Sequence, residues 1–184
     1  LGRSVLDYHS KLPTSTLYVG DDRPESKAIG VSFRQRCSLR TGLAFANAKG
    51  MTLFGRLAMN RHYGSGYGGG LRSEFAAKHP EWWLVRKTGK SDATRLSYFY
   101  PEYREERIGI LLEAAEIGAH GLCLDFCRQP PMMGYDPQVI DAYKAKGGDD
   151  PRSLKAGDRK FLDWCRSAEG QKIVEEVGFV PLGK

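Results

Sequence analysis

Short runs of β-forming residues alternate along this chain with stretches of helical periodicity, beginning near Leu17. This order is typical of βα units that build a parallel sheet. About four units can be counted, with strands expected at residues 17–19, 51–59, 95–98 and 121–127. The sequence therefore predicts an α/β fold with a parallel sheet, a partial (β/α) TIM-type barrel.

Helices are expected where capping residues and apolar spacing coincide. One is predicted over residues 39–49, ended by Gly50, and a shorter one over residues 73–78, whereas residues 22–38 are expected to form a loop. Two more are predicted, one after the Asp-Pro pair at 136–137 and one over residues 161–177.

The clearest helix is predicted to begin at Pro101 and to end at Gly118. Its spacing at i, i+3, i+4 and i+7 predicts a buried apolar stripe: Ile108, Leu111, Leu112 and Ala115. Glutamates, among them Glu106 and Glu113, are expected on its polar face.

Length and charge narrow the class of protein. With 184 residues of which 41% are hydrophobic, the chain can bury one core, and a single α/β domain over 1–184 is expected. Its 28 basic and 22 acidic residues are scattered, so no nucleic-acid partner is expected. No apolar run approaches the ~20 residues that cross a bilayer. We expect a soluble chain without a membrane partner, and the sequence leaves a periplasmic or secreted location open.

The four cysteines and four histidines do not indicate a metal or a cofactor. There is no paired CxxC motif, and the histidines are isolated from one another. Cys123 and Cys127 lie on one predicted strand about 13 Å apart, too far for a disulfide between them. No phosphate-binding order occurs in the glycine-rich segment 63–70.

Side-chain alternation in residues 121–127 singles out Asp125. A period of two places Leu122, Leu124 and Phe126 on one face and Asp125 on the other, with the apolar face expected to meet the helices. Asp125 would then point into the barrel near the C-terminal end of its strand, where such enzymes place catalytic groups. Arg128, just beyond the strand, is its expected partner. The alternative is an aspartate that ties down the following loop through hydrogen bonds.

The same alternation in residues 51–60 places Arg56 and Asn60 on the side of Asp125. Arg56 could bind substrate, or it could form an ion pair with Asp125, and the sequence favours neither. His62 follows on the same rim as a candidate substrate-binding residue, although an ordinary loop histidine is the alternative.

Aromatic and acidic side chains supply further candidates. The hydroxyl of Tyr98 could reach a polar ligand, and Trp82 or Trp83 could stack on a sugar ring. Glu102 is the nearest candidate for a second acid, but favourable placement at a helix N-terminus is the preferred explanation.

Several motifs in order resemble a bacterial family of glycoside-hydrolase-like TIM barrels, the family-10-like glycosyl hydrolases, over about residues 17–166. They are LRSEF at 71–75, HPE at 79–81, RLSYFYPE at 95–102, LDFCR at 124–128, GYDP at 134–137 and DPR at 150–152. The resemblance implies a carbohydrate-directed hydrolase with Asp125 at the strand-end carboxylate position. Residues 169–182 instead resemble the C-terminal end of periplasmic phosphate-binding proteins, so residues 167–184 are read as a foreign or divergent tail.

A complete barrel takes ~250 residues and eight strands, so an incomplete (β/α)8 barrel is expected, with the second catalytic carboxyl group on an absent strand. The leading hypothesis is a glycoside hydrolase-like protein in which Asp125 is acid or nucleophile and Arg128, Arg56, His62, Tyr98 and Asn60 position the sugar. A non-catalytic carbohydrate- or anion-binding module is the first rival. The second is a structural protein whose unpaired sheet edges form a homo-oligomer.

Overall fold

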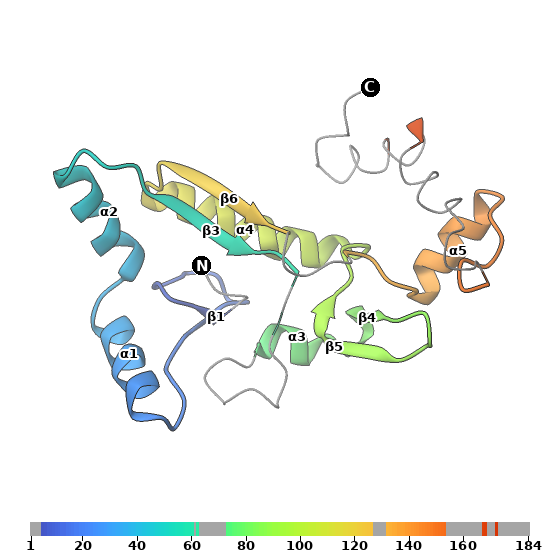
Figure 1. Ribbon diagram of the computed structural model, residues 1–184, viewed down its shortest axis with the longest axis horizontal. Coiled ribbons are helices and arrows are strands. Elements are labelled where there is room, and N and C mark those ends of the chain that lie inside the picture. The colour runs from blue at the N-terminus through green and yellow to red at the C-terminus, as the bar shows by residue number, and fades with distance from the viewer. Residues whose placement is uncertain are drawn as a thin grey trace. The chain divides into compact units, whose positions relative to one another are not determined.

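The computed structural model describes residues 5–60, 62, 73–126, 132–153, 167, 168 and 172 (Figure 1). The chain divides into two compact units, Leu1–Gly134 and Tyr135–Lys184, and each is described here by itself. Among the described residues the strands form two parallel pairs and one antiparallel pair, and no closed barrel. The protein is therefore a mixed helix and strand structure with small parallel sheets. The expected single domain over 1–184 stays a prediction.

The first unit opens with a short parallel pair, β1 Val5–Leu6 and β2 Thr16–Leu17. The segment expected to be a loop after it forms helix α1 Pro24–Gln35, so that prediction was wrong. Pro24 in the first turn and Glu25 beside it favour the helix start. Gly30 lets α1 approach the preceding chain, because a Cβ at this position would lie 2.1 Å from the carbonyl oxygen of Val19.

Helix α2 Ser38–Ala48 confirms the helix predicted over residues 39–49 to within one residue at each end. Gly50 follows it with φ 63°, the left-handed conformation that favours glycine after a helix. The ring of His120 joins α2 to the next strand, since its Nε2 donates to Oδ1 of Asn47 at 2.9 Å and its Nδ1 accepts from the Leu53 amide at 2.9 Å.

The centre of this unit is the parallel pair β3 Phe54–Ala58 and β6 Gly121–Asp125, which lie side by side with helix α4 Pro101–Ile117 against them (Figure 1). Ala58 is in register with Asp125. A side chain at Gly121 would require the ring of its partner Phe54 to move, because that ring lies 2.2 Å from where a Cβ would stand. A parallel pair requires a long crossover, and here α4 belongs to it.

Helix α4 has the predicted ends but not the predicted buried face. Pro101 is in its first turn and Gly118 follows it with φ 109°. Ile108 and Leu112, expected in the buried stripe, are 46% and 57% exposed. The buried residues instead include charged ones: Tyr103, Glu106, Arg107, Ile110, Leu111, Glu113 and Ala114. For Glu113 the reason is tertiary, because a distant chain segment supplies its hydrogen-bond partners, whereas Glu106 and Arg107 pair with each other.

Glu113 shows how this works. Its carboxylate accepts hydrogen bonds from the hydroxyl of Tyr8 at 2.8 Å, the hydroxyl of Ser10 at 2.5 Å and the amide of Lys11 at 2.6 Å. Burial acts to raise the pKa of Glu113, but these hydrogen bonds outweigh it, and the pKa lies below its ordinary value. Glu113 thereby ties the segment after β1 to α4.

A compact insertion lies between β3 and α4. Helix α3 Glu74–Lys78 confirms the short predicted helix, and the Ser73 side chain caps it by accepting from the Ala76 amide. A 3₁₀ turn, η2 Pro80–Trp82, leads into β4 Trp83–Val85, which pairs antiparallel with β5 Ser91–Leu96. Residues 95–98 were expected to form a third parallel strand. This was wrong, because the five-residue link 86–90, with Gly89 at φ 82°, returns the chain beside β4.

The second unit contains helix α5 Pro137–Ala145, which confirms the helix expected after the Asp-Pro pair. Asp150 forms ion pairs with Arg152 at 2.5 Å and Lys144 at 3.5 Å. Most of the helix predicted over residues 161–177, the glycine-rich segment 63–70 and most of the tail 167–184 lie outside the described residues.

Candidate functional site

Asp125 and Arg56 form an ion pair on one face of the β3–β6 sheet. Asp125 is the last residue of β6, and Arg56 is on the neighbouring parallel strand. Leu57, next to Arg56, is fully buried, whereas Arg56 is exposed, so these two residues point to opposite faces of the sheet. The alternation that placed Arg56 and Asp125 on one face is thus confirmed. Leu124, expected on the buried apolar face of β6, is 43% exposed, so that part of the expectation was wrong.

The two partners differ in accessibility. The side chain of Asp125 is 8% exposed and that of Arg56 is 54% exposed. A shielded carboxylate next to a solvent-facing guanidinium offers an incoming ligand both an anion and a donor of paired hydrogen bonds. Such a pair can hold sugar hydroxyls or take part in acid–base chemistry.

A buried polar cluster lies directly beyond the C-terminal end of β3, centred on the carbonyl oxygen of Met59. The hydroxyls of Tyr98 and Tyr103 both donate to this oxygen, at 2.8 Å and 2.6 Å. Burial raises the pKa of both tyrosines above the ordinary value, that of Tyr103 to about 12. Both hydroxyls are therefore hydrogen-bond donors in neutral solution.

His62 extends the cluster to the start of α3. Its ring is fully buried, with Nε2 3.2 Å from the Tyr103 hydroxyl and Nδ1 3.0 Å from Oγ of Ser73. Because the Tyr103 hydrogen goes to Met59, Nε2 of His62 must carry the hydrogen that it donates to Tyr103. In the neutral ring Nδ1 then accepts from Ser73, whose oxygen accepts from the Ala76 amide.

Charged groups flank the cluster on α4. Arg107 is fully buried, donates from Nε to Glu106 at 2.6 Å and lies 5.4 Å from the centre of the Tyr103 ring. Burial acts to lower the pKa of Arg107, but the charge of Glu106 outweighs it, and the pKa is raised. Arg107 is therefore a permanent cation beside the two tyrosines.

The comparisons with known proteins are negative. No protein-family model, no curated protein and no solved structure matches the chain.

The structure brings some predicted site residues together. Arg56 contacts Asp125, while Tyr98 and His62 join the Met59 cluster and are buried. Asn60 is also buried. Arg128 lies outside the described residues. The roles of these residues in binding or catalysis stay predictions.

Sequence reasoning missed Tyr103 and Ser73. Tyr103 is in the first turn of α4, with Arg107 four residues later, and this spacing could have placed both on one face. Ser73 was readable as a helix cap, three residues before Ala76. Neither signal points to His62, because the contacts of His62 with Ser73 and Tyr103 join separate segments of the chain.

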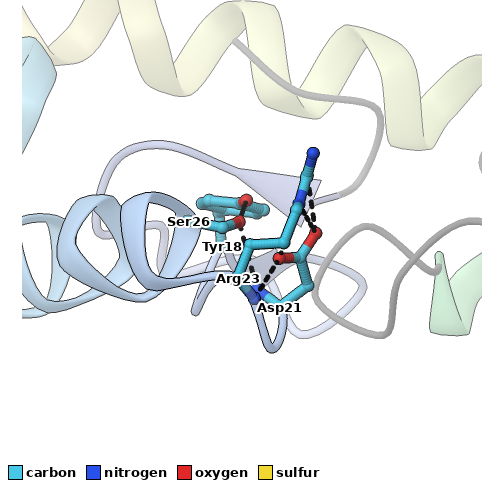
Figure 2. A network of polar contacts seen from close by, with 4 residues as sticks. All are labelled: Tyr18, Asp21, Arg23 and Ser26. Atoms are coloured by element: carbon cyan, nitrogen blue, oxygen red, sulfur yellow. Dashed lines mark hydrogen bonds and ion pairs between the residues drawn. The ribbon is translucent and has the colours of Figure 1, made fainter.

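A second polar network, missed in the same way, connects β2 with the start of α1 (Figure 2). The Tyr18 hydroxyl is hydrogen-bonded to Oγ of Ser26, which accepts from the Asp21 amide at 3.2 Å. Arg23 donates from two nitrogens to the carboxylate of Asp21, and these bonds hold the pKa of Asp21 well below its ordinary range. All four residues have roles in closing the turn into α1.

Aromatic side chains gather on the insertion. The rings of His79 and Trp82 stack with centres 3.7 Å apart, and Trp82 lies 6.0 Å from Tyr100. Trp83 is fixed through its Nε1, which donates to the Ala76 carbonyl at 2.7 Å. Trp82 and Trp83 are both half-buried and are both held by contacts within the insertion.

Two searches over the described residues were negative. No group of three histidine, cysteine or acidic side chains is arranged to hold a metal ion there. In that same part of the chain, no helix has the length and apolar character to span a membrane.

Proposed function

We propose that the protein acts on carbohydrate at the C-terminal ends of β3 and β6 through carboxylate chemistry at Asp125. The observation that carries the proposal is the position of Asp125, at the end of a parallel strand and in an ion pair with Arg56 of the neighbouring strand. TIM-type barrel enzymes place their working groups at this end of the strands. We further propose that β3, α4 and β6 belong to a TIM-type barrel of the glycoside-hydrolase-like family that the motifs resemble.

The ion pair with Arg56 indicates which of two catalytic roles, proton donor or anion, suits Asp125. Glycoside hydrolysis uses one carboxyl group as proton donor and another as an anion, either a nucleophile or a base. With the Arg56 guanidinium bound to it, Asp125 suits the anionic role. The proton donor is then a different group, and Glu102, exposed in the first turn of α4, keeps its simpler role at the positive end of that helix.

Replacing Asp125 by asparagine tests the proposal. We expect Asp125→Asn to abolish release of nitrophenol from para-nitrophenyl glycosides, because an amide cannot act as nucleophile or base. Asp21→Asn is the matched control: Asp21 is 11% exposed and also paired with an arginine, but it belongs to the turn before α1. Unaltered far-UV circular dichroism would establish that both variants fold. Equal turnover by wild type and Asp125→Asn would refute the catalytic role.

A non-catalytic carbohydrate- or anion-binding module is the second candidate. The observation that favours it is that Asp125 already has a guanidinium partner, as a structural or ligand-orienting carboxylate would. Calorimetry separates the two candidates. Oligosaccharide binding without turnover supports the module, whereas binding of inorganic phosphate would connect the function with the phosphate-binding-like tail.

A further inference from the structure

The buried cluster around Met59 is connected to Asp125 through the backbone. The Met59 amide donates to the carbonyl oxygen of Asp125 at 3.0 Å, which is the first backbone bond beyond the paired residues Ala58 and Asp125. On its other side the Met59 carbonyl accepts from Tyr98 and Tyr103. Both polar groups of this one residue are therefore fixed, one by β6 and the other by hydroxyls from outside the sheet.

Tyr103, the tyrosine of this cluster that belongs to α4, is itself held in place. Tyr103 is fully buried, and its hydroxyl accepts from Nε2 of His62 while it donates to Met59. The His62 backbone is fixed as well, since its amide donates to the Thr94 carbonyl at 2.7 Å. The order of contacts runs from Ser73 through His62 and Tyr103 to Met59 and ends at Asp125.

From this arrangement we infer that Tyr103 and His62 are positioning residues, which set the place of the Asp125 carboxylate by holding the end of β3 against the end of β6. The inference rests on the proposed function, because it assigns these two residues to the Asp125 site. The described contacts lead from these two residues to Asp125 through Met59, so their effect on the Asp125 site passes through that residue.

The physical reason is the position of the cluster on the strand. A hydrogen bond in the middle of β3 would be supported by ladder bonds on both sides, but Met59 is at the point where the pairing with β6 stops. The end of a ladder opens more readily than its centre. Two hydroxyl donors on a single buried carbonyl restrain that end, and a displacement of about 1 Å in a reacting group can cost on the order of a hundredfold in rate.

Removing the Tyr103 hydroxyl tests the inference. For a para-nitrophenyl glycoside that the wild type hydrolyses, we expect Tyr103→Phe to lower kcat about tenfold while KM changes less than about twofold. Exchange of the Met59 amide hydrogen should become faster by about tenfold in the same variant, because the end of β3 opens more often. His62→Leu should act in the same direction. His62→Gln should recover most of the kcat and the slow Met59 exchange that His62→Leu loses, since an amide can both donate to Tyr103 and accept from Ser73.

Tyr8→Phe is the matched control. Tyr8 is as buried as Tyr103, and its hydroxyl also makes a hydrogen bond that involves α4. Its partner on that helix is Glu113, which lies ten residues beyond Tyr103 and about 15 Å along the helix. We expect the Tyr8→Phe variant to be less stable than the wild type, with no change in kcat or in exchange of the Met59 amide hydrogen.

Three outcomes would overturn the inference. They are wild-type kcat in Tyr103→Phe, an equal fall of kcat in Tyr8→Phe, and Met59 exchange that does not respond to Tyr103→Phe. If the wild type hydrolyses no glycoside, the proposed function has failed, and Met59 exchange alone then decides whether the end of β3 depends on Tyr103.

Discussion

The three hydrogen bonds to Glu113 allow a stability prediction with a magnitude. Glu113→Gln keeps the size of the side chain but removes its charge and replaces one acceptor oxygen by a donor. Tyr8 is fully buried, so its hydroxyl cannot replace the lost bond by one to water. Ser10 and Lys11 are accessible enough to form hydrogen bonds with water instead. Because a hydrogen bond to a charged group contributes about 1.5 to 3 kcal/mol, we expect a loss of about 2 kcal/mol.

The loss depends on pH in a defined direction. The pKa of Glu113 is lower in the folded protein than in the unfolded chain, where it is about 4.3. The stabilisation is therefore present above the unfolded value and disappears as the pH falls through the folded value. The difference between wild type and Glu113→Gln should be full at neutral pH and should shrink below about pH 4.

Urea unfolding at several pH values measures both effects. A chain of this length should also show a fall in Tm of about 4 to 8 °C for 2 kcal/mol. Glu116→Gln, an exposed position on the same helix, is the control and should change stability by less than about 0.5 kcal/mol. The reasoning fails if Glu113→Gln costs no more than Glu116→Gln, or if its cost is unchanged in acid.

Two further predictions concern backbone packing and alkaline stability. Gly30→Ala should destabilise the protein by about 2 kcal/mol in urea unfolding, because its Cβ would meet the Val19 backbone, and this clash exceeds the better helix propensity of alanine. Gly109→Ala, whose Cβ would be 3.6 Å from the Leu12 side chain, should be neutral or stabilising, and equal effects of the two changes would contradict the packing argument. Burial raises the pKa of Tyr103 to about 12, so its contribution to stability is complete below the unfolded value of about 10 and is lost as the pH rises towards 12. The part of the tyrosinate absorbance that comes from the buried tyrosines should therefore lag behind that of free tyrosine until circular dichroism reports unfolding. Ionisation of all the tyrosines near pH 10 in a still folded protein would show that the Tyr98 and Tyr103 hydroxyls are not buried.

Local signals in the sequence predicted several elements correctly. Pro101 and Gly118 gave the ends of α4, and Gly50 gave the end of α2. Alternation alone placed Arg56 and Asp125 on one sheet face. These features could be predicted because each depends on residues within a few positions of one another.

The tertiary structure decided the features that depend on distant partners. The sequence shows Glu113 as a polar residue on a helix, and only Tyr8, Ser10 and Lys11, more than a hundred positions away, make its burial favourable. Likewise the sequence shows His62 only as a loop histidine, and its contacts with Tyr103 and Ser73 are visible only in the tertiary structure. Buried polar groups are stable only with their partners in place, and which partners meet is settled by the packing of whole elements, not by neighbours along the chain.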